Sequence, residues 1–130
     1  MGVRLLLDTS VVLWALLDPG KLSARAEEML SDRSNDVLVS AASAWEISTK
    51  YRLGKLPDAG LVVANYEEHL ATLGASEVSI SSSHALLAGA FEVDHRDPFD
   101  RMIAAQAVAL SMPVVTSDAA FGLFPCRVIW

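Results

Sequence analysis

The stretch Leu5-Leu6-Leu7-Asp8-Thr9-Ser10, in which the first apolar run of the chain gives way to polar residues, is the strongest indication of the fold. Residues 3–7 are nearly all apolar, as in a strand that is buried on both faces of a parallel sheet. An acidic residue, Asp8, follows this strand directly. In an open α/β sheet, ligands bind in the crevice outside the carboxyl ends of the strands. A charge at that position therefore predicts a functional edge as well as a fold.

Strand patterns and helix patterns alternate along the rest of the chain. The expected strands cover residues 3–7, 37–39, 77–80, 114–116 and 127–129. The expected helices cover residues 10–17, 23–30, 43–53, 61–73, 83–92 and 98–111. This alternation predicts an α/β fold built on one sheet. We expect one domain over residues 1–130, because the chain is short and has no linker-like segment.

Acidic residues recur where a strand gives way to a helix or a loop. They are Asp8, Glu46, Asp97, Asp100 and Asp118. If the strands are parallel, their carboxyl ends share one edge and these side chains meet in one pocket. Carboxylates gathered in one place repel one another, and a hard divalent cation is the usual compensation. The pattern therefore favours a metal site with oxygen ligands.

Each acidic residue also has an ordinary local explanation. Asp8 is a preferred N-cap residue, and Asp118 can begin a turn. Glu46 fits a capping box that starts at Ser43, and it can pair with Lys50 one helical turn later. Taken singly, none of these three carboxylates requires a metal.

The pair Asp97 and Asp100 opens the clearest helical pattern of the chain. Asp97 followed by Pro98 is a common helix start, with an N-cap and a proline at the first helical position. Asp100 falls in the first turn, where the helix dipole favours a negative charge. Capping explains Asp97 fully, whereas the metal interpretation of the others rests on their occurring together.

Composition limits the classes of protein. Hydrophobic residues make up 52% of the chain, which indicates a large core or an apolar surface that a partner covers. The apolar runs are too short for a membrane span, and Asp8 interrupts the first of them. The single cysteine, Cys126, cannot form an internal disulfide, which fits a reducing cytoplasm. The formal charge of −6 weakens a nucleic-acid interpretation without excluding it, because local patches matter more than the total.

Four segments resemble the PIN-domain nucleases, and specifically the VapC-type toxin ribonucleases. They are Leu-Leu-Leu-Asp8-Thr9-Ser10, Ser-Ala-Ala-Ser-Ala-Trp-Glu46-Ile, Asp97-Pro98-Phe99-Asp100-Arg101-Met-Ile-Ala-Ala-Gln and Val-Val-Thr116-Ser117-Asp118. The third segment is quite specific, and the match as a whole covers essentially the whole chain. The resemblance implies a three-layer α/β/α domain with a mostly parallel sheet in the strand order 3-2-1-4-5.

The resemblance also implies a site and an activity. The family's four acidic positions are matched by Asp8, Glu46, Asp100 and Asp118. Ser10 and Thr116 match nearby hydroxyls that orient water or a ligand, and Asp97 belongs to the subgroup's motif without being one of the four. We expect an Mg²⁺-dependent endoribonuclease, with Mn²⁺ as a substitute ion and with Asp8 and Asp100 as the principal ligands. The implied biological role is the toxin of a toxin–antitoxin pair.

Several partners follow from these expectations. The RNA backbone needs cations near the acidic pocket, and the candidates are Lys50, Arg52, Lys55, Arg96 and Arg101. Arg101 ranks first because it adjoins Asp100, although solvated helix ends and salt bridges explain such cations equally well. His95 is a further residue that can face the substrate. The family implies a cognate antitoxin and a homodimer, and the helix at residues 10–17 is apolar on every side, as in a buried helix or an interface.

Two other classes of protein also place aspartates at strand ends, but the residues of this chain fit them less well than a nuclease. A receiver-type signalling domain would place paired acids after the first strand and a lysine near the last strands, and neither is present. A phosphatase of the Asp-x-Asp type fails because position 10 is Ser10. Two alternatives stay open: a catalytically silent interaction module of the same fold, and a PIN nuclease that acts on DNA or in RNA processing.

Overall fold

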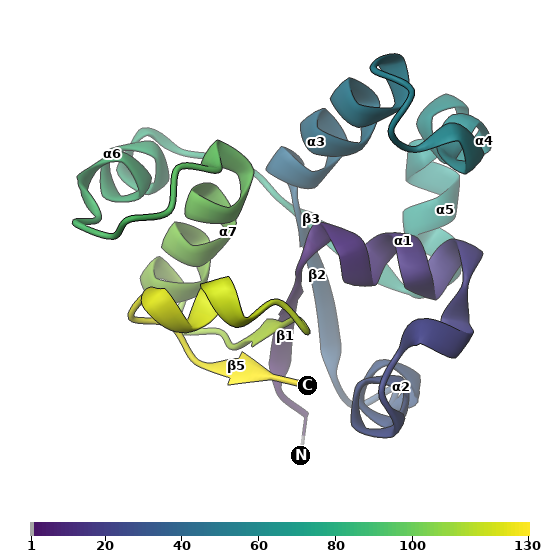
Figure 1. The fold of residues 1–130 in the computed structure, drawn as a ribbon. Helices are drawn as coiled ribbons and strands as arrows, with labels where there is room; N and C mark the ends of the chain where they lie inside the picture. The colour runs from purple at the N-terminus through teal and green to yellow at the C-terminus, as the bar shows by residue number, and fades with distance from the viewer. Residues whose placement is uncertain (1) are drawn as a thin grey trace.

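A five-stranded parallel sheet forms the middle layer of the molecule (Figure 1). The computed structural model describes residues 2–130. The strands are β1 (Arg4–Leu7), β2 (Asp36–Ser40), β3 (Ala75–Val78), β4 (Val114–Val115) and β5 (Val128–Ile129). Their order is β3-β2-β1-β4-β5, and every pairing is parallel. The expected α/β fold and strand order are confirmed.

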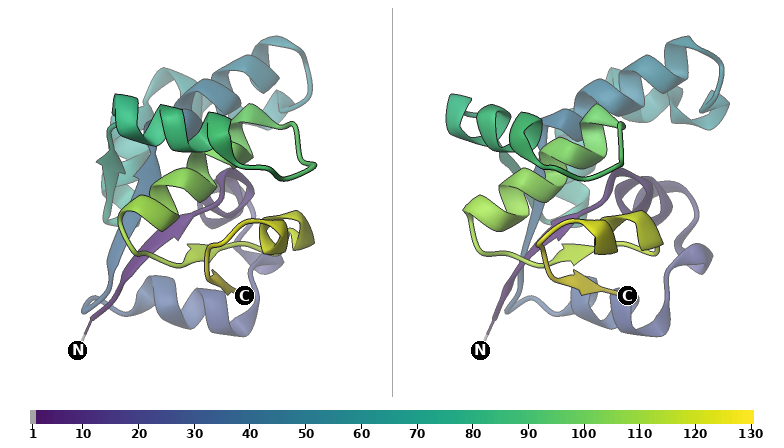
Figure 2. Two further views of the ribbon diagram at one scale, coloured as in Figure 1. Left: turned by 90° about the vertical axis from the view of Figure 1, so that its left-hand side faces the viewer. Right: turned by 60° about the vertical axis from the view of Figure 1, so that its left-hand side comes forward.

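Helices cover both faces of this sheet. They are α1 (Thr9–Leu17), α2 (Ala24–Ser31), α3 (Ala41–Arg52), α4 (Gly60–Ala64), α5 (Tyr66–Leu73), α6 (Ser82–Ala90) and α7 (Pro98–Ala109). Three short 3₁₀ turns are η1 (Pro19–Lys21), η2 (Pro57–Ala59) and η3 (Ala119–Leu123). Figure 2 shows α6 and α7 in front of the strands, with α1 and α2 behind them. None of the helices within residues 2–130 is long and apolar enough to cross a membrane.

The alternation of side chains along β1 explains why both faces need cover. Leu5 and Leu7 pack on one side with Val11 of α1, whereas Leu6 packs on the other side with Ile103 of α7. All three leucines are fully buried. Each contributes roughly 1.5–3 kcal/mol relative to an exposed leucine, so β1 anchors the two halves of the core.

The register of the central strands sets the functional edge. Leu7 lies opposite Val39 of β2 and Val115 of β4, so the next residue of β1 leaves the sheet level with the ends of both neighbours. That residue is Asp8, whose N–H donates to the Val115 carbonyl over 3.0 Å. On β2 the corresponding residue is Ser40, whose hydroxyl caps α3 by accepting the Ala42 N–H.

Expected and observed element bounds differ by one or two residues in several places, and two of the differences have a clear local cause. The helix expected over residues 61–73 is interrupted at Asn65, which leaves the helical conformation and whose side chain donates to the Leu61 carbonyl. Asparagine competes for backbone groups in this way and is therefore a weak helix residue. The third strand runs Ala75–Val78 and not over residues 77–80, because Ala75 already pairs with Val37.

Candidate metal centre

Asp8 is buried at the carboxyl end of β1, with 6% of its surface exposed. Its Oδ2 accepts a hydrogen bond from the Thr116 hydroxyl over 2.8 Å. Burial raises the pKa of Asp8 to about 7, and the Thr116 hydrogen bond opposes part of this shift. The negative charges of Asp100, Glu46 and Asp118 raise the pKa further. Asp8 is thus electrostatically coupled to the three other acidic residues that the sequence singled out.

Asp100 stands in the first turn of α7, on the side that faces the sheet edge. It is 8% exposed, and its Oδ2 lies 2.8 Å from Nε2 of His95. Burial raises the pKa of Asp100 to about 6, against the hydrogen bond from His95, and the charges of Asp97 and Glu46 add to the increase. Asp97 itself caps α7 by accepting the N–H groups of Phe99 and Asp100 over 2.9 and 3.2 Å. The expected capping role of Asp97 is confirmed.

Glu46 lies on the buried face of α3 and is 5% exposed. Its Oε2 pairs with Nζ of Lys50 at 2.5 Å, as the sequence spacing indicates. Its Oε1 is buried and has no hydrogen-bond partner within the described residues. A buried carboxylate oxygen without a donor is costly, so the surroundings of this atom fit a bound cation.

The capping box expected at Ser43 is wrong. α3 begins at Ala41 with Ser40 as its cap, so Ser43 already lies inside the helix. Its hydroxyl forms a buried hydrogen bond of 2.9 Å with the Thr9 hydroxyl. This contact joins the start of α1 to the start of α3 and fixes the helix that carries Glu46 relative to Asp8.

Asp118 is the exposed member of the group and begins η3. Its N–H donates to the Thr116 hydroxyl, and its Oδ1 accepts the Ala120 N–H, both over 2.9 Å. Thr116 therefore connects Asp8 and Asp118 through a single hydroxyl. The expectation that Thr116 serves the acidic residues agrees with these contacts.

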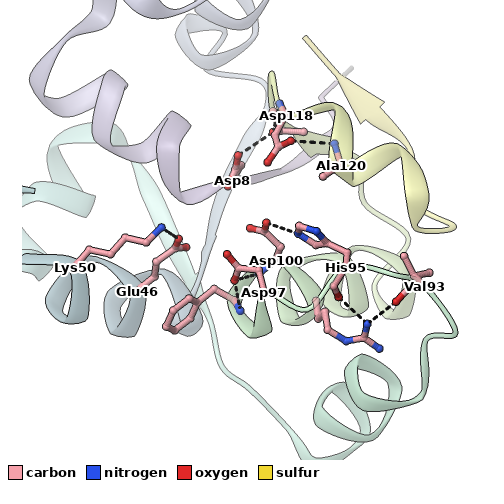
Figure 3. Close-up of polar contacts among 12 residues, drawn as sticks. Asp8, Glu46, Lys50, Val93, His95, Asp97, Asp100, Asp118 and Ala120 are labelled. Carbon is pink, nitrogen blue, oxygen red and sulfur yellow. Dashed lines mark hydrogen bonds and ion pairs between the residues drawn. The ribbon is translucent and has the colours of Figure 1, made fainter. Parts of the chain in front are cut away.

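The four carboxylates surround one space from four different elements (Figure 3). Within residues 2–130, no three His, Cys, Asp or Glu side chains converge closely enough to form a ready-made cage for an ion. Each carboxylate is instead held by a local partner: Thr116, Lys50, His95 and Ala120. Mg²⁺ usually takes one or two carboxylates and keeps several waters, so an open set of oxygen donors fits it. The buried, unpartnered oxygen of Glu46 and the raised pKa values support the same fit.

Ser10 has different surroundings from the four acids. It is exposed in the first turn of α1 and lines a cavity of 480 Å³ together with Lys21 and Lys55. None of the four carboxylates lines this cavity. Ser10 thus borders a neighbouring hollow, next to two lysines.

The basic residues expected to contact RNA fall into two groups. Arg52 and Arg96 are exposed, and Lys50 is half-buried against Glu46. Arg101 is different, because its guanidinium donates to five backbone carbonyls between residues 88 and 95. In this structure all five of its donors bind backbone carbonyls, and a direct contact between Arg101 and an RNA phosphate stays a prediction.

Sequence reasoning missed several contacts that hold the site together. Thr9 and Ser43 link two helices at the edge of the sheet, and their only signal was proximity to Asp8 and Glu46. His95 was named only as a residue facing the substrate, whereas it binds Asp100 and lies edge-on to Phe124, with ring centroids 5.8 Å apart. Its position depends on a loop that no periodic pattern describes.

Comparison with known protein families gives a match over most of the chain. Residues 5–124 match the sequence model of the family described as PIN domain. A segment of 56 residues is 39% identical to Ribonuclease VapC16 from Mycobacterium tuberculosis. That segment spans 43% of the chain and 40% of the relative, so less than half of that relative is covered.

Solved structures of the same fold cover nearly the whole chain. VapBC2 from Rickettsia felis, bound to a DNA fragment from their promoter, gives a TM-score of 0.71 at 17% identity, over 98% of both chains. FitAcB from Neisseria gonorrhoeae gives 0.62 at 24% identity, over 97% of this chain and 96% of the other. PAE2754 from Pyrobaculum aerophilum gives 0.55 at 17% identity, over 97% and 83%. At these identities the likeness concerns the fold.

Proposed function

The chain belongs to the PIN-domain family, and from this premise we propose that residues 1–130 form one PIN domain acting as a divalent-metal-dependent endoribonuclease. The proposed reaction is hydrolysis of RNA phosphodiester bonds. The proposed biological role is the toxin of a toxin–antitoxin module. The relative named as a ribonuclease and the fold neighbours that contain toxin–antitoxin pairs support this proposal.

One observation carries the proposal more than any other. Four carboxylates from β1, α3, α7 and the end of β4 are coupled at one edge of the sheet, and two of them have raised pKa values. Capping explains a single acid at a helix start, but it gives no reason to bury Asp8, Glu46 and Asp100 together. Such an arrangement costs stability unless a cation compensates it, and costs of this kind cluster at functional sites.

The residues present fit a divalent cation, with Mg²⁺ as the proposed ion and Mn²⁺ as a substitute. Asp8 and Asp100 would be the principal ligands, and Glu46 and Asp118 would complete the site directly or through water. When bound, the ion would supply Lewis-acid polarisation of the phosphodiester and easier deprotonation of water. It would also compensate the mutual repulsion of the acids.

The protein's own groups orient the proposed ligands. The Thr116 hydroxyl holds Oδ2 of Asp8, and His95 holds Oδ2 of Asp100. Lys50 holds Oε2 of Glu46 and leaves Oε1 without a partner. In each case the protein binds one oxygen of the carboxylate. This contact fixes the orientation of the carboxylate and leaves its other oxygen available to a ligand.

The RNA strand would be bound by cations and by an aromatic surface. Lys50, Arg52 and Arg96 remain the candidates for phosphate contacts. Trp45 precedes Glu46, is 62% exposed and contacts Phe99 edge-on, with ring centroids 4.7 Å apart. An exposed indole beside the acidic site offers a stacking surface for a base of a single strand.

The proposed protein partners are a cognate antitoxin and a second copy of the chain. α1 is not fully covered: Val11 and Val12 are buried, whereas Leu17 at its end is 45% exposed. Leu61 and Leu86 are 73% and 75% exposed on other helices. Apolar side chains at these positions are consistent with surfaces that a partner covers.

The direct test is cleavage of single-stranded RNA by the purified chain, with Mg²⁺, with Mn²⁺ and with chelator. We expect cleavage that chelator abolishes and that either ion restores, with 5′-phosphate and 3′-hydroxyl ends by analogy with the family. Absence of cleavage with both ions, in protein freed of any co-purified antitoxin, would favour the silent interaction module. Cleavage of DNA alone would favour a different nuclease role.

A further inference from the structure

The segment between α6 and α7 is held without the usual backbone contacts. Residues 91–97 form neither helix nor strand. Within residues 2–130, no backbone N–H or C=O group of residues 92–96 pairs with another backbone group. A connection of this kind is expected to be mobile unless side chains fix it. It carries His95, the residue that contacts Asp100.

One side chain replaces the missing backbone contacts. The guanidinium of Arg101, in the first turns of α7, donates to two carbonyls at the end of α6 and to three along this connection. They are Ala88 (2.9 Å), Gly89 (3.5 Å), Phe91 (2.6 Å), Val93 (3.2 Å) and His95 (2.9 Å). A guanidinium has five N–H donors, so each of them is used once.

Two of these carbonyls belong to the last turn of α6, and the others follow it. The final carbonyls of a helix lack intrahelical partners, and a basic side chain near them satisfies them and interacts well with the helix dipole. Arg101 therefore caps α6 and continues along the chain that follows. Lysine cannot replace it, because an ammonium has three donors and lacks the rigid planar fork.

The connection returns to the acidic site through His95. Its carbonyl accepts from Nη1 of Arg101, and its ring bonds to Oδ2 of Asp100 over 2.8 Å. Asp100 thus binds the ring of His95, and the next residue of α7, Arg101, binds its backbone carbonyl. The ring also lies edge-on to Phe124.

We propose that Arg101 is a positioning residue, which fixes residues 88–95 so that His95 holds the Asp100 carboxylate in one orientation toward the acidic site. The part of this proposal in which Asp100 binds a metal ion rests on the proposed function. The part in which Arg101 positions His95 is independent of it. A direct contact between Arg101 and an RNA phosphate is the competing assignment.

The first experiment needs neither metal nor RNA. The chain has three histidines, so the imidazole signals can be followed by NMR in the metal-free protein. We expect Arg101→Lys and Arg101→Met to move the His95 ring signals away from their position beside Phe124, while His69 on α5 keeps its own. Arg33→Met, an exposed arginine before β2, is the matched control and should leave both unchanged. Unmoved His95 signals in folded Arg101→Lys would overturn the proposal.

The second experiment asks whether Arg101 acts through His95. Residues that orient a metal ligand usually change affinity by about 10–100-fold, and we expect a loss of Mn²⁺ affinity in that range for Arg101→Lys and for His95→Ala. If Arg101 works through His95, the double variant should lose no more than His95→Ala alone. Losses that multiply would overturn the proposal and favour a separate role for Arg101.

The outcomes separate this inference from the proposed function. If the wild-type chain binds no Mn²⁺ at all, the metal site is contradicted, and the NMR result still decides whether Arg101 positions His95. If Arg101→Lys keeps both the His95 signals and the Mn²⁺ affinity but weakens RNA binding, Arg101 is a phosphate contact and the inference is overturned.

Discussion

The strand side and the helix side of the acidic site hold their carboxylates by different chemistry. The strand side consists of Asp8 and Asp118, which accept hydrogen bonds from neutral donors, the Thr116 hydroxyl and the Ala120 N–H. Neither donor brings a positive charge. Burial raises the pKa of Asp8 to about 7, and no nearby positive charge opposes this rise. The increase is larger than that of Asp100, whose pKa rises to about 6.

The helix side consists of Glu46 and Asp100, and each contacts a side chain that can carry positive charge. Lys50 pairs with Glu46, and His95 contacts Asp100, whose pKa rises only to about 6. Because of these two partners, the negative charge on the helix side is partly compensated by the protein itself. The strand side depends more on a bound cation, so perturbing it should have the larger effects.

The largest expected effect is on catalysis by the Asp8→Asn variant. Removing a principal ligand should lower metal-dependent RNA cleavage by more than about 100-fold, beyond the usual cost of losing a residue that only orients a ligand. Initial cleavage rates at saturating Mg²⁺ measure this loss. The matched control is Asp36→Asn, an exposed aspartate at the opposite end of β2, which should cleave like the wild type. Full activity of Asp8→Asn would remove Asp8 from the site.

The same substitution should stabilise the metal-free fold. The folded-state pKa of Asp8, about 7, lies above its ordinary value of 3.8, so the native state binds more protons than the unfolded state and loses stability as the pH rises between these values. Above about pH 7 the cost is complete, and Asp8→Asn should raise the free energy of unfolding there by about 4 kcal/mol. Urea unfolding in chelator measures this gain, which should vanish near pH 4. Destabilisation at high pH would contradict the assigned burial cost.

A smaller effect is expected from Thr116→Val. The variant removes the donor to Asp8 and the acceptor of the Asp118 N–H, so unfolding at about pH 8 should become easier by about 1–2 kcal/mol. Thermal or urea unfolding of the metal-free variant measures the change. A neutral result would mean that water replaces the hydroxyl, and the strand side would then not be held by Thr116.

The smallest effect is expected on the helix side, from Lys50→Met. The Lys50 side chain is 37% exposed, whereas that of Glu46 is 6% exposed, so water can take the place of the ammonium beside Oε2 and the loss should stay at about 1 kcal/mol. Urea unfolding should therefore show a change below that of Thr116→Val. A larger loss than in Thr116→Val would reverse the comparison between the two sides.

The sequence was most informative where one periodic pattern determined several contacts. The buried run before Asp8 predicts a central parallel strand, and the register of that strand then places Asp8 level with Thr116. The Asp97-Pro98 start of α7 and the spacing of Glu46 and Lys50 likewise correspond to contacts in the structure. In each case the interacting residues are close in sequence or are aligned by strand pairing.

The sequence was least informative where a side chain acts on distant backbone. The sequence predicts Arg101 as a phosphate contact because it adjoins Asp100, whereas in the structure its donors bind backbone carbonyls six to thirteen residues away. Ser43 was read as a helix cap because of its spacing to Glu46, whereas Ser40 caps the helix and Ser43 bonds to Thr9. Neither contact follows from periodicity, because each depends on how segments far apart in the sequence pack together in three dimensions.

Calorimetric titration of Mn²⁺ into the metal-free chain distinguishes a metal centre from a set of unconnected helix caps. We predict saturable binding to the wild type and to Asp36→Asn, and a loss of affinity of more than about 100-fold in Asp8→Asn. Absence of saturable binding to the wild type, or equal affinity in Asp8→Asn, would contradict the claim that these carboxylates form a metal centre.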